Sequence, residues 1–258
     1  MPEERRPTRR GGGASWRTHA VSSAVEDLVT AQRDRLGRPL RVLDLGGGTG
    51  GLAVPLAELG HEITVIDPSP DALAALERRA AEAGVAGRVT ARQGDADILS
   101  EMRPDDGFDL VCCHGVLEVV DDPESTLSAV AAVLAPGGHL SVTVAGRLAV
   151  VLARVLAGDF AQATAALTSE DGRWGATDPL PRRFDLVRLR TLLEAAGFSV
   201  EHLQGIRVFG DLAPSGSTDT AADRAAFVAL EQAVATHPDH AGALGGLGAH
   251  LHALACRR

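Results

Sequence analysis

The chain has 258 residues, 45% of them hydrophobic, which is enough for one large α/β domain with a substantial core. Its formal net charge of −9 disfavours broad, non-specific binding to nucleic acid, although it leaves room for a local basic patch. No apolar run approaches the length of a membrane span, so we expect a cytoplasmic protein with no membrane partner. The three cysteines fit neither a disulfide framework nor the spacing of metal ligands, and we expect no metal.

Residues 1–15 combine several arginines with a run of glycines and contain almost no apolar side chains. Such a segment has too little to bury, so we interpret it as a disordered basic arm, and we favour a solvated tail over an RNA-gripping one. From residue 16 to residue 36, apolar side chains recur at helical spacing and predict a helix over the sheet edge or a ligand cleft. The folded domain is expected over 16–258.

The most informative stretch is a short apolar strand that runs directly into a glycine-rich turn. The turn fits the pattern D-x-G-x-G-x-G through Asp44, Gly46, Gly48 and Gly50. It also fits the dinucleotide spacing G-x-G-x-x-G, but a carboxylate ahead of the first glycine suits a cationic or neutral ligand better than a pyrophosphate. S-adenosylmethionine carries a sulfonium, an amino group and no phosphate. We therefore predict a site for this cofactor at Asp44, Gly46, Gly47 and Gly48.

Predicted strands and helices alternate from this turn to about residue 144, which is typical of a doubly wound, Rossmann-like sheet. Capping signals such as Ser69 or Asp71, and Asp122 followed by Pro123, mark the helix starts. The later strands are predicted at 63–66, 89–92, 108–113 and 139–144, and the helices between them at 52–59, about 69–84 and 122–134. We expect an α/β fold whose sheet is mostly parallel with an antiparallel last strand.

Three polar residues follow the carboxyl ends of these strands, where ligands of open α/β sheets bind. Asp67, about twenty residues beyond the glycines, is placed to accept hydrogen bonds from both ribose hydroxyls. Asp95 is placed to bind an adenine amino group, with a helix-cap role as its alternative. His114 ends the fourth strand and therefore lies in the site by topology.

The pattern changes after the fifth strand, where two apolar helical segments, 148–156 and 160–167, precede a polar loop. We interpret residues 146–183 as a lid-like insertion over the crevice or a wall of the substrate site. The remaining elements are predicted as a helix from Asp185 to Gly197, a strand over 198–209, a helix over 221–236 and a last strand over 247–255. His250 and His252 share one face of that last strand, and we expect surface or edge placement in preference to metal binding.

With these motifs the chain resembles the class I S-adenosylmethionine-dependent methyltransferases over about residues 38–145. The motifs are residues 42–50, Asp67, Asp95 with Ala96, and residues 134–138. More narrowly, the chain resembles the tRNA 5-carboxymethoxyuridine methyltransferases through residues 114–118, 154–160 and 205–211.

This resemblance implies a set of cofactor contacts. It assigns the methionine part to Gly46 and Gly47, the ribose to Asp67, the adenine region to Asp95 and Ala96, and the sulfonium side to His114. An arginine in the first helix is expected to hold the cofactor carboxylate. Ala20 occupies the aligned position here, so Arg17, one turn earlier, is the candidate.

The methyl acceptor is open between two classes. A modified tRNA wobble uridine, methylated on its carboxymethoxy group, is implied by the resemblance and favoured by Arg207, Arg182 and Arg183. Arg207 can pair with an anionic substrate group, although a structural ion pair is an equal alternative. A small metabolite is favoured by the negative net charge and the insertion. A binding protein without catalysis and a nicotinamide-dependent oxidoreductase are disfavoured by Asp44. The sequence gives no oligomeric state.

Methyl transfer from a sulfonium is an in-line displacement, so positioning and exclusion of water are the main tasks. A carboxylate acceptor needs no base. For a hydroxyl or an amine, His114 is the best candidate base, although a cofactor-positioning role is favoured for it.

Overall fold

The computed structural model describes residues 19–102, 104–214, 216 and 218–258. Within these residues seven strands form one sheet in the order β3-β2-β1-β4-β5-β7-β6. Neighbouring strands from β3 to β5 are parallel, whereas β7 is antiparallel to β5 and β6. The strands are β1 (Arg41–Leu45), β2 (Glu62–Asp67), β3 (Val89–Gln93), β4 (Phe108–His114), β5 (Leu134–Ala145), β6 (Phe198–Ile206) and β7 (His250–Arg257). The predicted fold class is confirmed.

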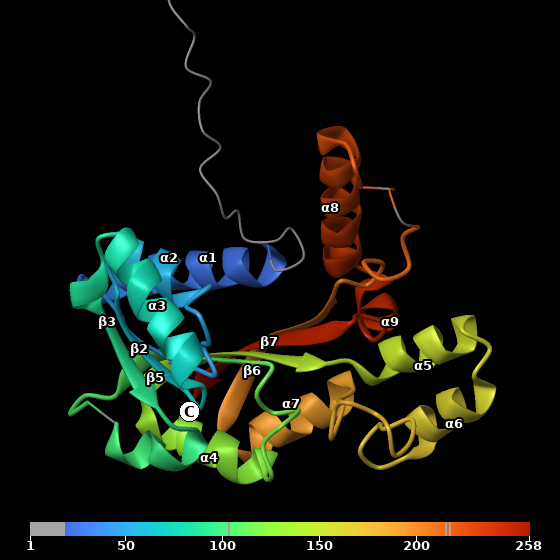
Figure 1. The fold of residues 1–258 in the computed structure, drawn as a ribbon, viewed down its shortest axis with the longest axis horizontal. Helices are drawn as coiled ribbons and strands as arrows, with labels where there is room; N and C mark the ends of the chain where they lie inside the picture. The colour runs from blue at the N-terminus through green and yellow to red at the C-terminus, as the bar shows by residue number, and fades with distance from the viewer. Residues whose placement is uncertain (1–18, 103, 215, 217) are drawn as a thin grey trace, which may run out of the picture.

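Helices cover both faces of the sheet (Figure 1). On one face lie α1 (His19–Leu36), α2 (Ala53–Glu58) and α3 (Pro70–Glu82), and on the other lie α4 (Pro123–Val133) and α7 (Leu186–Ala195). Successive side chains of a strand enter different cores, because they alternate between the faces. Val42 belongs to the core under α1 with Val25, while Leu43 belongs to the opposite core with Leu127 of α4.

The helix starts follow the capping signals of the sequence. The Ser69 hydroxyl accepts a hydrogen bond from the Ala72 amide, so Ser69 rather than Asp71 caps α3. Asp122 and Asp185 cap α4 and α7 in the same way. The predicted helix at 221–236 is confirmed as α8 (Ala221–Thr236). The sequence analysis missed three short segments, which have too few residues for a periodic signal: η1 (Ala86–Arg88), η2 (Ala96–Glu101) and α9 (Ala241–Gly245).

The C-terminal strands correct two expectations. β6 ends at Ile206 rather than at 209, because Arg207 leaves the extended region with a φ of 57°. β7 lies between β5 and β6 and pairs with both, so it is not an edge strand. His252 is fully buried, and the expectation that it would lie at the surface or the sheet edge is wrong.

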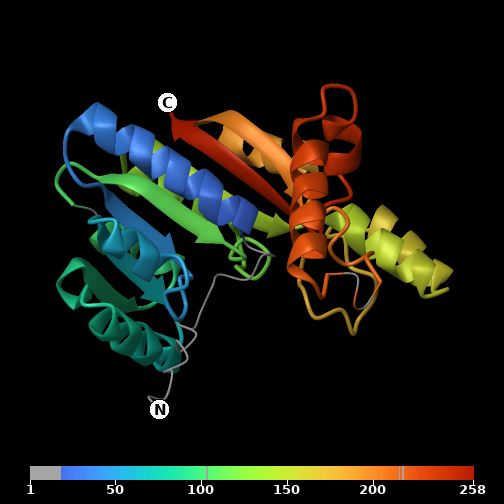
Figure 2. The same cartoon turned by 90° about the horizontal axis from the view of Figure 1, so that it is seen from above.

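The insertion begins with two helices close to the predicted positions, α5 (Arg147–Leu156) and α6 (Phe160–Thr168). Figures 1 and 2 show this pair beyond one end of the sheet, beside the segment that joins β6 to α8. In the part of the chain that the structure describes, no helix has the length and apolarity needed to cross a membrane.

An ion pair ties the start of β1 to the start of β4. Both terminal nitrogens of Arg38 donate to the two carboxylate oxygens of Asp109 at 2.8 Å, and the Arg41 amide donates to the same carboxylate at 2.8 Å. Burial raises the pKa of Asp109, but these hydrogen bonds outweigh it and hold the pKa below its usual range. The Asp109 side chain is only 6% exposed, so the pair is shielded on the carboxylate side.

We expect Asp109→Asn to destabilise the protein by about 1–2 kcal/mol at pH 7, near the lower end for charged hydrogen bonds because Arg38 is partly solvated. A depressed pKa in the folded state contributes stability above the unfolded pKa and loses it as pH falls through the folded pKa. The difference from the parent protein, measured by urea unfolding, should therefore shrink as the pH falls below the unfolded pKa of about 3.9. It should disappear once Asp109 is protonated in the folded protein as well. Asp106→Asn is the matched control, since its 83% exposed carboxylate makes a longer contact with Arg41. A difference that persists unchanged at low pH would contradict the charge-based account.

Candidate functional site

A crevice of about 770 Å³ lies outside the carboxyl ends of β1 to β4. This is the size of a typical small-molecule site. Its lining includes most of the predicted site residues: Gly46, Asp67, Asp95, Ala96 and His114. The structure brings these residues to one edge of the sheet, because parallel strands end at the same edge, and their contacts with a cofactor stay a prediction.

The glycine turn is held by contacts that exclude larger side chains. The Gly46 amide donates to the Ile66 carbonyl at 2.7 Å, which ties the turn to β2. A Cβ on Gly47 would lie 2.5 Å from Oδ2 of Asp44 and 2.9 Å from Val65. Gly48 has a φ of 55°, and its amide donates to Oδ2 of Asp67 at 2.8 Å. The turn thus packs its backbone directly onto one carboxylate and hydrogen-bonds another.

Asp44 is a buried carboxyl group under that turn, only 4% exposed. Burial, together with the charge of nearby Asp67, raises the pKa of Asp44 to about 7. A cationic group in the crevice would favour the ionised form of Asp44, whereas a phosphate would oppose it. The carboxyl therefore fits a ligand with a positive charge.

Asp67 ends β2 and is already oriented by the backbone. Its Oδ2 accepts from the Gly48 amide, and its Oδ1 accepts from the Ser69 amide at 2.9 Å. A carboxylate can accept about four hydrogen bonds, so two acceptor positions are left for ligand hydroxyls. Asp95 accepts from the Asp97 amide at 3.0 Å and caps η2, which confirms the cap role while leaving its second oxygen for a ligand.

His114 belongs to a hydrogen-bonded series that the sequence analysis did not anticipate. Its Nε2 lies 2.8 Å from the Ser141 hydroxyl, which lies 3.0 Å from Nε2 of His252. The two imidazole rings meet edge to face, with centroids 6.3 Å apart. Burial lowers the pKa of His114 to about 4 and that of His252 to about 3. Both rings are therefore neutral at pH 7.

The positions of the protons in the His114–Ser141–His252 hydrogen bonds can be assigned from the ring nitrogen that has no partner. Nδ1 of His252 is buried and has no hydrogen-bond partner among the residues that the structure describes. A buried N–H without an acceptor is rarer than a buried lone pair without a donor, so the proton of His252 belongs on Nε2. His252 then donates to Ser141, and the Ser141 hydroxyl donates to Nε2 of His114. The proton of His114 is left on Nδ1, free for a partner other than Ser141.

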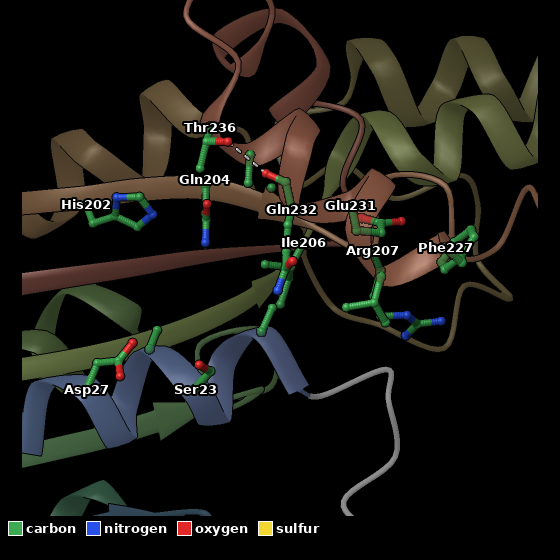
Figure 3. A pocket seen from close by; sticks show the side chains of 15 residues that line it. Ser23, Asp27, His202, Gln204, Ile206, Arg207, Phe227, Glu231, Gln232 and Thr236 are labelled. Atoms are coloured by element: carbon green, nitrogen blue, oxygen red, sulfur yellow. Dashed lines mark hydrogen bonds between the residues drawn. The ribbon is translucent and has the colours of Figure 1, made fainter. Parts of the chain in front are cut away.

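Arg207 is not among the described residues that line the crevice. It forms an ion pair with Asp211 and stands where two other cavities meet. One, of about 300 Å³, lies between α1, β6 and α8. Figure 3 shows Ser23 and Asp27 of α1 on one side of it and Gln232 and Thr236 of α8 on the other. The ion-pair alternative for Arg207 is thus observed, and a role toward substrate stays a prediction.

The other two arginines proposed for RNA are used internally. Arg182 donates to the carbonyls of Leu117, Val120 and Asp121 in the loop after β4. Arg183 is buried and pairs with Asp178 through two hydrogen bonds of 2.6 and 2.9 Å. Both side chains are therefore engaged within the protein, and their contribution to binding RNA stays a prediction with less support. Arg17 and the basic arm lie outside the described residues.

The second cavity beside Arg207, which we call the insertion cavity, has a volume of about 440 Å³. It lies between α5, the end of β5 and the chain around β6 and β7, and its α5 wall is apolar: Ala149, Val150, Leu152, Ala153 and Leu156. Among the described residues, none from the predicted insertion at 146–183 lines the cofactor crevice itself. The cavity nevertheless starts close to His114, since Ala145 lines it and Thr143 is the register partner of His114.

Glu118, Ser141 and His252 are buried polar residues behind the crevice lining to which the sequence analysis gave no role in the site. Glu118 is 3% exposed, and its Oε1 accepts from the Ala145 amide at 2.7 Å. Ser141 and His252 occur in apolar strands, where a polar residue at a buried position is a usable signal. The sequence does not show which residues these polar groups bind, because the partners lie far apart along the chain. Ser141 and His252 are 111 residues apart.

Comparison with known proteins agrees with this geometry. The model of a methyltransferase domain family matches residues 15–203. The tRNA 5-carboxymethoxyuridine methyltransferase of Escherichia coli (strain K12) is 34% identical over 72% of this chain and 70% of that protein. A ubiquinone biosynthesis O-methyltransferase of Xanthomonas euvesicatoria pv. vesicatoria (strain 85-10) is 32% identical over 54% of this chain and 56% of that protein.

Among solved structures, the magnesium protoporphyrin IX methyltransferase of Synechocystis PCC 6803 has a TM-score of 0.58 and 16% identity, covering 96% of this chain and 90% of that one. At that identity the likeness concerns the fold. Together with the family match over most of the chain, it places the protein among the class I S-adenosylmethionine-dependent methyltransferases, the family to which this chain belongs.

Proposed function

We propose that this methyltransferase acts on a carboxylate, specifically the carboxymethoxy group of a modified uridine in tRNA. A carboxylate acceptor is supported by the protonation state of His114, the imidazole that lines the crevice, which is neutral and already accepts a hydrogen bond from Ser141. The nucleoside is supported by the relative from Escherichia coli, whose printed name is tRNA 5-carboxymethoxyuridine methyltransferase.

The cofactor fits the crevice by an observation independent of the comparisons. The crevice is surrounded by carboxyl groups, with Asp44 beneath the turn and Asp67, Asp95 and Asp97 on the wall. Acceptors of this kind suit a sulfonium, an amino group and hydroxyls, whereas a pyrophosphate would meet like charge. Gly46, Gly47 and Gly48 would hold the methionine part, Asp67 the ribose, and Asp95 and Ala96 the adenine. The bound cofactor supplies an electrophilic methyl group on sulfur.

A carboxylate acceptor is favoured because the site offers no strong base at His114. A pKa of about 4 makes that imidazole a weak acceptor of protons, and Ser141 already donates to its Nε2. A hydroxyl acceptor would need a proton removed, while a carboxylate oxygen attacks the methyl carbon as it is. In that reaction a C–O bond forms, the C–S bond breaks with its electron pair going to sulfur, and no proton moves. His114 then positions groups through its Nδ1–H.

The acceptor would enter through the insertion cavity, whose apolar α5 wall lies next to the end of β5. The cavity is adjacent to the strand positions that carry His114 and Thr143. Arg207 and Asp211 also line the cavity, and Arg207 could exchange Asp211 for an acceptor carboxylate, because a guanidinium binds either carboxylate through the same fork.

A small metabolite that carries a carboxylate is the second candidate. It is favoured by the apolar wall of the insertion cavity and by the internal use of Arg182 and Arg183, which leaves fewer arginines for phosphates. Both candidates share the carboxylate chemistry and differ in what carries it.

The first prediction from the proposed function concerns the glycine turn. Gly47→Ala should weaken S-adenosylmethionine binding at least about tenfold, because its Cβ would collide with Asp44 and displace the turn. Gly51→Ala is the matched control, since a Cβ there meets nothing within 4 Å and binding should be unchanged. Calorimetry of folded variants measures both. Equal affinities for the two variants would refute the account of the turn.

The second prediction concerns the base. With saturating substrates, kcat should be flat from about pH 6 to pH 9, because His114 is already neutral there and a carboxylate acceptor is ionised. His114→Gln should lower kcat by less than the roughly 10²–10⁴-fold expected from loss of a general base. A parent profile that rises through a pKa near 7 and flattens in the variant would show instead that His114 removes a proton.

The third prediction separates the acceptors. Labelled cofactor and bulk tRNA from source cells lacking this gene should yield labelled nucleosides after digestion. The label should be released by mild alkali, since methyl esters hydrolyse and methyl ethers and N-methyl groups do not. Label found only in small molecules from an extract of the same cells would replace tRNA by a metabolite. Label that resists alkali would remove the carboxylate from the proposal.

A further inference from the structure

A second cluster of reactive side chains lies away from the crevice. His139, Glu201 and Cys256 come from β5, β6 and β7, and their ligand-type atoms all lie within 4.8 Å of one another. His139 lies near the middle of β5, at one end of its pairing with β7, and about 13 Å along the strand from Thr143, which pairs with His114. The cluster is thus distinct from the cofactor site.

Strand register brings the three residues together. His139 and Cys256 are direct partners in the antiparallel β5–β7 pair, and Cys256 is also opposite Ser199 in β6. The register of β6 shifts between Val200 and His202, which leaves Glu201 at a bulge. A bulge re-aims the side chain of its extra residue, and here it directs Glu201 toward the other two.

The spacing fits a bound ion better than a direct hydrogen bond. Nε2 of His139 lies 3.5 Å from Oε2 of Glu201, longer than the roughly 2.7–2.9 Å of a charge-assisted hydrogen bond. Metal–nitrogen and metal–oxygen distances of about 2.0–2.2 Å at a tetrahedral zinc ion would place these atoms about 3.3–3.5 Å apart. Only 9% of the His139 side chain is exposed. Its imidazole is therefore held in place by packing, and Nε2 is already positioned as a ligand.

We propose that His139, Glu201 and Cys256 form a binding site for a divalent transition-metal ion of the zinc type. Thiolate and imidazole ligands favour such an ion over magnesium or calcium, which prefer oxygen. Glu201 is half exposed, so water can reach the site and occupy a fourth position. The expectation of no metal, which came from cysteine spacing, did not consider ligands from three separate strands.

Charge is compatible with the ion. Burial and the charge of Glu201 raise the pKa of the Cys256 thiol, so its proton would be released as the ion binds. Ionised Glu201 and the resulting thiolate would then carry two negative charges, which balance a divalent cation. Arg35, at the end of α1, is the nearby opposing charge that acts on His139 and Cys256. Once bound, the ion links the edge strand β6 to β7 and β5 and braces this side of the sheet against opening.

The test uses the full chain with its purification tag removed. One sample is titrated with Co²⁺ and followed by its absorption spectrum, and another is dialysed against Zn²⁺ and analysed for bound metal. We expect one metal ion per chain and a thiolate-to-cobalt charge-transfer absorption. Cys256→Ser should abolish that absorption, since Cys112 and Cys113 are buried in β4. Glu201→Gln should weaken zinc binding at least as much as outer-shell changes do, about 10- to 100-fold.

His202→Gln is the matched control, because His202 is an exposed neighbour of Glu201 outside the cluster and its loss should leave binding unchanged. Glu201 is itself half exposed, so Glu201→Gln keeps the test valid if Cys256→Ser fails to fold. Zinc should also raise the melting temperature of the parent and of His202→Gln, and should raise that of Cys256→Ser and Glu201→Gln less at the same zinc concentration. Absence of the charge-transfer band, or metal binding that is equal in all variants, would overturn the proposal.

Discussion

The packing of the glycine turn onto the Asp44 carboxyl is the contact on which the rest of the crevice depends. A Cβ at Gly47 would lie only 2.5 Å from the Asp44 carboxylate oxygen, so the turn can follow its path only with glycine there. That path places the Gly48 amide on Asp67 and the Gly46 amide on the Ile66 carbonyl. The carboxyl ends of β1 and β2 are thereby held in one arrangement, with the Asp67 carboxylate at the wall of the crevice.

The antiparallel strand β7 has a comparable influence on the other half of the molecule. By entering between β5 and β6, it places His252 beside Ser141, and Ser141 beside His114. A histidine that would titrate near neutrality in water is held neutral by burial and receives a defined proton arrangement. The same placement of β7 between β5 and β6 brings Cys256 next to His139 at the opposite end of the β5–β7 pair. One topological feature therefore underlies the proposed chemistry at one end of the sheet and the proposed metal site at the other.

The arginines illustrate how composition and structure differ in what they say about partners. A chain with 25 basic residues and 34 acidic ones can still bind RNA locally, but only through side chains that are free to do so. Arg182 and Arg183 are engaged with the loop after β4 and with Asp178. Arg207 is paired with the Asp211 carboxylate, which a substrate carboxylate could replace. Of the three arginines, Arg207 is therefore the one proposed to bind substrate.

Much of the cofactor side could be predicted from the sequence. Strand, turn and helix signals are local, and a parallel sheet places the ends of its strands together, so the sequence alone predicts that Asp67, Asp95 and His114 share one crevice. What only the tertiary structure decided was strand order and register. Whether His252 faces solvent or Ser141, whether Glu201 reaches Cys256, and whether Arg183 is free or buried depend on pairings between distant segments and on a one-residue bulge. Local sequence patterns contain no information on these pairings, because they are set by which strands pack against each other once the chain has folded.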